Sequence, residues 1–369
     1  MITNRQIVCF APNHWFGLKT SKHHLMTEFS RKNRVIYVEP VTDFISVIFR
    51  RSRWYKLKFC TKISDNIAVV SPITLVVSKG NQLIRCMNQF LQRFYLKFFY
   101  IEWTNTILWS YDPSSYKYFK RYQPMLKLYF IADEYTIHKG SYLPYIAREE
   151  GKTLDSADLT FAVTEKLQAS KQKPESPIYL SHNAVNTSLF DIDLDYPTPP
   201  EFTNIERPLI GVVGAVRDWV DVDLIIETAH KNPDLVFTSV GPGWPFGKQV
   251  PENLLIIGQR PYDKIPAYIN SMTVGLIPFK VTEYTRSTNP LKLYEYLALG
   301  KPVVVTDMLG YDSFADVVFI SKNSDQFSEN INRALADAVR IRSRAISIAR
   351  ENSWESRAEV IANKIVEII

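Results

Sequence analysis

The sequence predicts an α/β protein with two consecutive doubly wound, mostly parallel sheets. Short apolar runs rich in β-branched residues alternate with segments of helical periodicity along most of the chain. A proline-rich stretch without periodicity, residues 194–208, interrupts this alternation. The 369 residues leave room for two domains of roughly 150 residues each. We expect one domain over residues 1–190, a second over 191–352, and a final helix over 353–369 that can return to the first domain.

The first domain is expected to begin with a β-α-β unit. Residues 6–10 and 34–40 are apolar runs typical of buried strands, and residues 21–32 between them have helical spacing. Further buried parallel strands are expected at 106–110, 127–133, 159–164 and 177–182, with a helix at 147–157.

The alternation restarts after the proline-rich stretch. Strands are expected at 209–216, 235–243, 253–258, 274–279 and 301–307, and helices at 221–232, 264–272 and 289–300. Ser353 can cap the final helix. Parallel sheets of this kind bind ligands at the carboxyl ends of their strands, so we expect the two domains to face a central cleft.

The composition excludes several classes of protein. Three irregularly spaced cysteines, Cys9, Cys60 and Cys86, fit neither a disulfide framework nor a zinc knuckle. No uninterrupted apolar run reaches the roughly 18 residues of a membrane span, and the N-terminal run is too short for a signal peptide. We expect a cytoplasmic protein, either soluble or peripheral on the inner face of the cell membrane.

Residues 44–100 carry ten Lys or Arg residues against one acid, Asp65, interleaved with eleven aromatic residues. This excess of cations suggests an anionic partner, either a membrane surface or nucleic acid. Residues 81–100 have an apolar helical stripe, which is typical of a helix packed on the core or of one at a membrane interface. We favour the membrane surface and expect no nucleic acid.

Residues 285–307 contain the most informative stretch of the chain. Ser287, Thr288 and Asn289 precede a predicted helix, with Asn289 as its cap, and a helix N-terminus is a favourable place for phosphate. Lys292 and Glu295 share one face of that helix. A cation for a diphosphate and a carboxylate for ribose hydroxyls would recognise a nucleoside diphosphate. The alternative is a surface ion pair.

Several separated segments resemble the GT-B glycosyltransferases, particularly the family-4-like bacterial enzymes and the related glucuronosyltransferases that build surface polysaccharides. The matching segments are residues 163–170, 182–190, 213–225, 290–307 and 353–361. The resemblance implies two Rossmann-like domains, with the acceptor bound by the first and the donor by the second. It implies transfer of a sugar from a nucleoside diphosphate sugar, a UDP-hexose, to a glycan or lipid-linked acceptor, without a metal or other cofactor.

The resemblance also assigns roles to individual residues. The family's glutamate that matches Glu295 binds the ribose, and the lysine that matches Lys292 lies near the phosphates. Many members carry another glutamate eight positions before Glu295, facing the donor sugar, and this chain has Ser287 there. The donor sugar and the stereochemistry of transfer therefore do not follow from the resemblance.

Two glycine turns follow predicted strands of the second domain. Gly214 and Gly241 would let the backbone approach a phosphate closely, or would only form turns. Arg217 could pair with the diphosphate, because a guanidinium matches phosphate oxygens in a fork. By analogy with the family, Arg260 and Tyr262 border the base.

For the general base we favour Asp133, at the end of a predicted strand of the first domain, with Glu134 as the alternate. Acids at strand ends also cap the next helix, and in a retaining reaction Asp133 would only bind acceptor. His14, Trp15, Gly17 and His24 follow the first strand and could line the acceptor side, or merely start a helix. No acids stand at metal-ligand spacing beside these histidines, so no metal is expected.

Two other classes of protein remain open from the sequence. A nucleotide-sugar epimerase or hydrolase of the same fold would use the same donor site without a basic aromatic surface. A non-catalytic scaffold that binds membrane or nucleic acid would use the basic aromatic surface, and its donor site would have lost its function.

Overall fold

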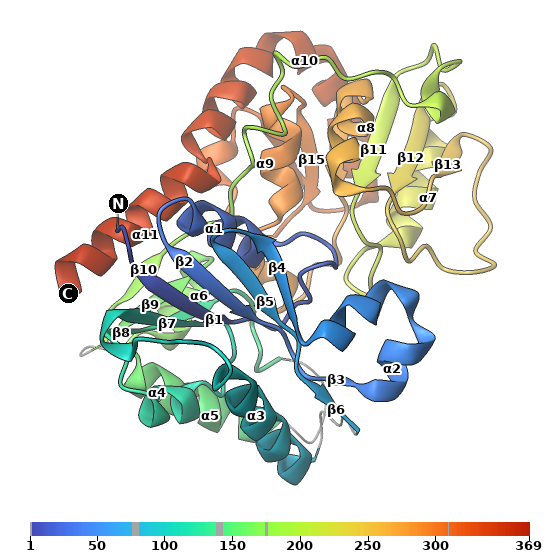
Figure 1. Ribbon diagram of the computed structural model, residues 1–369. Helices are drawn as coiled ribbons and strands as arrows, with labels where there is room; N and C mark the ends of the chain where they lie inside the picture. The colour runs from blue at the N-terminus through green and yellow to red at the C-terminus, as the bar shows by residue number, and fades with distance from the viewer. Residues whose placement is uncertain (1, 76–80, 138–142, 174–175, 309) are drawn as a thin grey trace. The chain divides into compact units, whose positions relative to one another are not determined.

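The computed structural model describes residues 2–75, 81–137, 143–173, 176–308 and 310–369 (Figure 1). The chain forms two compact units, one of Met1–His182 with Arg357–Ile369 and one of Asn183–Ser356. Both are α/β, as the sequence predicted, and each is described by itself below. The terminal helix α11 (Trp354–Ile368) begins in the second unit and continues into the first.

The first unit contains an eight-stranded sheet in the order β10-β9-β8-β7-β1-β2-β5-β4, parallel except for the β4–β5 pair. The strands expected from the sequence are all present, and β4 and β5 were not anticipated. In chain order the strands of this sheet are β1 (Gln6–Phe10), β2 (Arg34–Val38), β4 (Cys60–Ser64), β5 (Ile67–Val70), β7 (Thr106–Ser110), β8 (Leu126–Ile131), β9 (Leu159–Ala162) and β10 (Ile178–Leu180).

Helices and a small second sheet complete the first unit. Helices α4 and α5 lie side by side, and α3 lies with them below the strands in Figure 1. The short strands β3 (Thr42–Asp43) and β6 (Ile73–Thr74) pair separately. The helices are α1 (Ser21–Ser30), α2 (Phe44–Phe49), the 3-10 helix η1 (Arg51–Lys58), α3 (Gln82–Leu96), α4 (Tyr116–Arg121), α5 (Leu143–Ser156) and α6 (Glu165–Lys171).

The second unit contains a fully parallel six-stranded sheet in the order β13-β12-β11-β14-β15-β16. Helices α8 and α9 cover one face of it, and α7 covers the other. Its elements are β11 (Leu209–Val213), α7 (Val222–Lys231), β12 (Val236–Val240), β13 (Leu254–Ile256), α8 (Ile265–Ser271), β14 (Val274–Ile277), α9 (Leu291–Ala298), β15 (Val303–Thr306), β16 (Val318–Ser321) and α10 (Ser324–Glu351).

Two elements of the second unit were missed from the sequence, strand β16 and the 28-residue helix α10. Asn323 could have indicated the start of α10, because asparagine is a favoured helix cap. Its side chain accepts a hydrogen bond from the Gln326 N–H at 2.9 Å and so caps this helix. The predicted cap of α11 is confirmed, since Ser353 Oγ accepts from the Ser356 N–H at 3.1 Å.

A buried tyrosine fixes α9 on the sheet. The Tyr296 hydroxyl accepts a hydrogen bond from the Val213 N–H at 2.8 Å and donates to the Gly211 carbonyl at 3.1 Å, both on β11. Its ring lies where a Cβ at residue 275 would stand, only 2.5 Å from the nearest ring carbon, so Gly275 of β14 is required for this contact. Helix α9 is thereby held at one position along β11.

We predict that Tyr296→Phe lowers the free energy of unfolding by about 1–3 kcal/mol, because the Val213 N–H would be buried without an acceptor. Denaturant unfolding followed by circular dichroism measures this loss. The matched control is Tyr100→Phe, since Tyr100 is largely exposed. Equal stability of the two variants would contradict the anchoring role of the hydroxyl.

Candidate functional site

Three predicted site residues of the second unit are in contact with one another. Lys292 and Glu295, on the first turns of α9, form an ion pair between Nζ and Oε2. The Tyr262 hydroxyl donates to the other carboxylate oxygen, Glu295 Oε1, at 3.1 Å. The Lys292 ammonium also stands 5.7 Å from the centre of the Tyr262 ring. The structure therefore brings these three side chains into one cluster.

The members of this cluster differ in their access to solvent. Glu295 is only 2% exposed, and a buried carboxylate requires partners such as the lysine and the tyrosine that contact it. Burial, followed by the charge of Glu295, raises the pKa of Tyr262, so its hydroxyl stays protonated and can donate. Lys292 is more accessible, with a quarter of its side chain exposed. A ligand can reach the lysine without unfolding the helix.

Two glycine turns lie beside this cluster. Gly214, which follows β11, has φ 132°, and a Cβ there would stand 3.8 Å from Lys292 Cε. A Cβ on Gly241, which follows β12, would stand 1.8 Å from the Gly214 carbonyl oxygen, so a larger residue would separate the two turns. The Gly214 N–H donates to the Val240 carbonyl at 2.9 Å. The two turns and the lysine stem therefore form one surface at the carboxyl ends of β11 and β12.

The polar segment before α9 differs from the prediction in its helix cap. Asn289 was expected to cap α9, and this expectation was wrong: the helix begins at Leu291 and is preceded by Pro290 in an extended conformation. Because Pro290 is not yet helical, with ψ 123°, it occupies the cap position and Asn289 lies one residue before it. Its Oδ1 accepts instead from the Asn183 N–H at 2.8 Å and from the Tyr294 hydroxyl at 3.2 Å.

The two hydroxyl residues of the same segment bond to their own turn. Ser287 ends the 3-10 helix η5 (Thr285–Ser287), is buried, and donates to the Glu283 carbonyl at 3.1 Å. The Thr288 hydroxyl donates to the Thr285 carbonyl at 2.7 Å. In this conformation both hydroxyls contact backbone of their own segment.

The two predicted arginines have different surroundings. Arg217, in the turn after Gly214, is exposed. Arg260 pairs with Glu201 at 2.5 Å, and its Nε donates to the Tyr268 hydroxyl at 2.8 Å. The structure thus places Arg260 in a second polar group, whereas its sequence neighbour Tyr262 contacts Glu295.

The predicted acids of the first unit follow β8. Asp133 is half-buried, and one of its oxygens lies 3.9 Å from the ammonium of Lys22 on α1. Burial lowers the pKa of Lys22, while the charge of Asp133 opposes that shift. Glu134 is buried and accepts hydrogen bonds from Lys171 at 2.9 Å and from the Thr136 N–H at 3.1 Å. Its carboxylate therefore takes part in an ion pair and in a turn.

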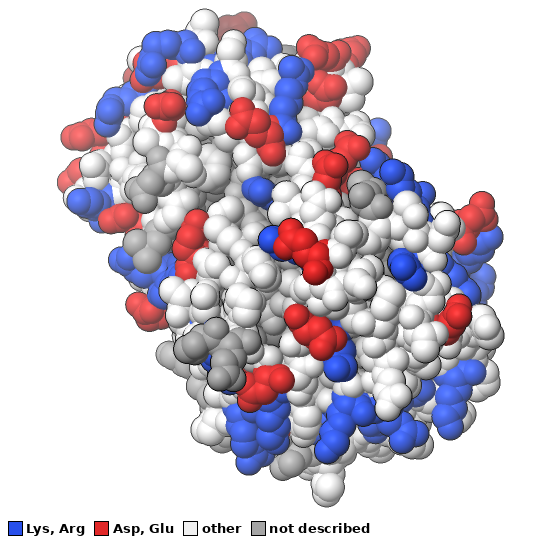
Figure 2. Space-filling view, turned by 90° about the vertical axis from the view of Figure 1, so that its left-hand side faces the viewer, with Lys and Arg blue, Asp and Glu red and all other residues white. Residues whose placement is uncertain are grey.

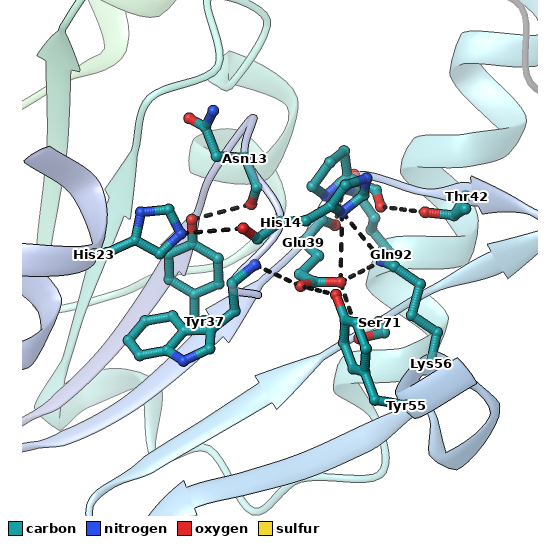
Figure 3. Close-up of polar contacts among 12 residues, drawn as sticks. Asn13, His14, His23, Tyr37, Glu39, Thr42, Tyr55, Lys56, Ser71 and Gln92 are labelled. Atoms are coloured by element: carbon teal, nitrogen blue, oxygen red, sulfur yellow. Dashed lines mark hydrogen bonds and ion pairs between the residues drawn. The ribbon is translucent and has the colours of Figure 1, made fainter. Parts of the chain in front are cut away.

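The loop after β1 joins a polar network that the sequence did not reveal (Figure 3). Its centre is Glu39, fully buried at the end of β2. Glu39 accepts hydrogen bonds from the Trp15 N–H at 2.7 Å and the Tyr55 hydroxyl at 2.6 Å, and forms an ion pair with the fully buried Lys56. Ser71 donates at 3.0 Å.

Of the four residues predicted to line the acceptor side, His14 is the one at the edge of this network. Its Nδ1 lies 3.1 Å from Lys56 Nζ and 3.5 Å from Glu39 Oε2, and part of its ring reaches the surface. Trp15 and His24 are buried, and the Gly17 N–H donates to the His14 carbonyl at 3.0 Å. The network therefore fixes the loop on which His14 stands.

Hydrogen bonding keeps Glu39 ionised. Burial raises the pKa of this carboxyl, but the contacts from His14, Lys56 and Tyr55 outweigh burial and lower the pKa to about 2. A group with a lowered pKa stabilises the folded state above its ordinary pKa, and the stabilisation is lost as the pH falls toward 2.

Among the described residues, no group of three His, Cys, Asp or Glu side chains could hold a metal ion. Within the same residues, no helix is long and apolar enough to cross a membrane.

Comparison with known proteins identifies the class to which this fold belongs. Residues 207–337 match the family described as "Glycosyl transferases group 1". Along 99% of both chains the structure is similar to sucrose-phosphate synthase from Thermosynechococcus elongatus, with a TM-score of 0.74 and 13% identity. It is also similar to Anabaena HepE in complex with UDP and glucose, with a TM-score of 0.69 and 13% identity over 99% of this chain and 100% of that one.

These comparisons confirm the GT-B fold and the resemblance to glycosyltransferases. At the level of sequence, the chain is 31% identical over 176 residues to the putative teichuronic acid biosynthesis glycosyltransferase TuaH of Bacillus subtilis (strain 168). That match spans 46% of this chain and 43% of the relative, so it covers less than half of either protein.

We predict that Glu39→Gln lowers stability most at neutral pH, by about 3–5 kcal/mol, because Lys56 would stay buried without its counter-ion. Between pH 5 and pH 2 the wild type should lose about 3 kcal/mol that the variant does not lose, since the pKa of Glu39 is lowered from 4.5 to about 2 in the folded protein. Chemical denaturation over this pH range measures both free energies. A stability difference that does not narrow on acidification would contradict this role of Glu39.

Proposed function

We propose that this protein is a glycosyltransferase that moves a sugar from a nucleoside diphosphate donor to a glycan or lipid-linked acceptor in surface polysaccharide biosynthesis. The observation that carries the proposal is the cluster of Lys292, Glu295 and Tyr262 beside Gly214. The match of residues 207–337 to a glycosyltransferase family supports it independently. Because the relative TuaH is a putative teichuronic acid enzyme, an anionic cell-surface glycan is the acceptor class we favour.

Each member of the cluster has a distinct role in binding the donor. The carboxylate oxygens of Glu295 can accept hydrogen bonds from the two ribose hydroxyls. Lys292 can then turn its ammonium toward the diphosphate, over the open backbone at Gly214. Tyr262 supplies an aromatic face for the base, and we favour uracil because HepE was solved with UDP.

In the transfer step the acceptor oxygen bonds to the anomeric carbon of the sugar. The bond from that carbon to the diphosphate oxygen breaks, and the diphosphate keeps the electron pair. Lys292, with the exposed Arg217, would stabilise the charge that develops on this leaving group. The acceptor hydroxyl must lose a proton, and Asp133 is the carboxylate we propose to accept it. The ammonium of Lys22 lies 3.9 Å from one oxygen of Asp133.

We predict that Lys292→Ala and Glu295→Ala each weaken UDP binding by about tenfold to a hundredfold, the usual effect of losing a hydrogen bond to a charged group. Isothermal titration calorimetry with UDP measures the affinity. The control is Lys248→Ala, which removes a lysine of the same unit that pairs with Asp223 at the surface. Unchanged affinity in both site variants would remove the cluster from the donor site.

Glu295→Gln refines this test, because an amide keeps the shape of the carboxylate but loses its charge. It should bind UDP more weakly than the wild type, and thermal unfolding should show that the fold is kept.

Incubation with a donor alone separates the proposal from a hydrolase or epimerase, since rapid donor turnover without any acceptor would favour one of those enzymes.

For Asp133→Asn we predict a loss of transfer of a hundredfold or more with UDP affinity unchanged, because only the proton acceptor is removed. The corresponding change at the buried alternate, Glu134→Gln, should mainly lower stability, since Lys171 contacts Glu134. Transfer assays with a radiolabelled donor, run beside calorimetry, measure the two effects. Near-normal transfer by Asp133→Asn would exclude it as the base.

A further inference from the structure

Helix α3 and the residues directly after it present a row of large apolar side chains to solvent. Leu83, Met87, Phe90, Phe94 and Phe98 recur at helical spacing on one face, and all are exposed, Leu83 by 80% and Phe98 by 63%.

The opposite face of α3 carries glutamines. Gln89 is buried, and Gln92 donates to the Glu39 carbonyl at 3.0 Å and accepts from the Tyr118 hydroxyl at 2.6 Å. A surface helix normally has the reverse arrangement. The five exposed side chains are therefore not part of the core of this unit, although Leu96 of the same helix is buried.

A second exposed apolar segment adjoins the first. In α2 and η1, the side chains of Ile45, Phe49, Trp54 and Leu57 are each more than half exposed. Phe59, which follows η1, contacts Tyr95 and Phe98 at ring-centre distances of 6.0 and 5.9 Å. The contacts of Phe59 join η1 to the end of α3. Exposed apolar patches of this extent mark interaction surfaces in soluble proteins.

Cations surround this apolar surface. Arg50 and Lys58 are exposed beside α2 and η1, and Lys97 is exposed at the end of α3. A cavity of about 340 Å³ next to α3 is lined by aromatic rings, among them Phe94 and Trp103, and by Arg93, Lys97 and Arg121. Figure 2 shows Lys and Arg side chains gathered at the lower end of the molecule, where α3, α4 and α5 lie in Figure 1.

We propose that α2, η1 and α3 form a docking face for an anionic lipid bilayer, with the aromatic and aliphatic side chains in the interface and the cations on lipid phosphates. Apolar anchors bordered by cations are what an interfacial helix requires. The cavity offers both an apolar wall and three cations to one lipid headgroup. A second copy of this chain is a poorer occupant, because it would bring like charges together. This inference does not depend on the proposed donor site.

The first test is co-sedimentation with vesicles of phosphatidylcholine alone or mixed with phosphatidylglycerol. The wild type should bind the anionic vesicles, and binding should weaken with salt. The double variant F90D/F94D should bind at least about tenfold more weakly, because two charged side chains would replace two apolar anchors. The matched control is Val339→Asp, which places the same charge at an exposed apolar position on α10.

Three outcomes of this test would overturn the proposal. They are wild-type protein that does not bind anionic vesicles at low salt, a double variant that binds like the wild type, and self-association in analytical ultracentrifugation that F90D/F94D abolishes. UDP affinity of the double variant, measured by calorimetry, should be unchanged. A failure of membrane binding is thus distinguishable from a failure of the donor site.

The second test asks whether α3 enters the bilayer interface. Cys86 lies on α3 and is exposed, whereas Cys9 is buried, so a dye can be attached to Cys86 in a Cys60→Ser background. Its emission should shift to the blue on anionic vesicles and be quenched by a lipid-borne quencher. The same dye at Val339→Cys, with Cys86 replaced by Ser, should not respond. Vesicle binding without a response at Cys86 would contradict docking through α3.

Discussion

The position of α9 on the second sheet depends on the phenol of Tyr296. Its two hydrogen bonds reach the N–H of Val213 and the carbonyl of Gly211, on the strand that ends at Gly214. A hydrophobic contact alone would let a helix shift along the sheet. A buried hydroxyl bonded to two backbone groups instead fixes the position of α9 along β11. Lys292 and Glu295 therefore have a defined position relative to the glycine turns. The same bonds make Gly275 obligatory, because the ring occupies the place of its side chain.

Four buried glutamates of the described residues share one arrangement, in which a lysine and a tyrosine hydroxyl contact each carboxylate. One of them is Glu149, with Lys152 and Tyr145. Glu39 has Lys56 and Tyr55, Glu150 has Lys171 and Tyr129, and Glu295 has Lys292 and Tyr262. Lys56 is fully buried and Lys171 nearly so, while Lys292 keeps a quarter of its side chain exposed. The same arrangement thus has a buried lysine at Glu39 and Glu150 and a partly exposed lysine at Glu149 and Glu295.

The elements set by local pattern could be predicted from the sequence, and those set by distant contacts could not. Strands of β-branched residues and the Lys292–Glu295 pair follow from spacing alone. Helix α10 was missed because Asn330 and Ala334, both buried, interrupt its apolar pattern. Asn289 was misassigned because Pro290 is extended instead of forming the first helical residue, so the helix starts one residue later. The partners of Glu39 come from η1 and from the residue after β5, so only the fold brings them together.

Helix α3 is attached to its unit through the buried Leu96 and through the inward-facing amides of Gln89 and Gln92, while five large apolar side chains of the same segment stay exposed. Those exposed side chains gain little from the hydrophobic effect when the protein is free in water. Local opening of the helix should therefore need much less free energy than global unfolding, and its backbone amides should exchange with solvent early. Docking of this face on a bilayer, as proposed, would add the burial of these side chains to the stability of the region, which the isolated polypeptide lacks.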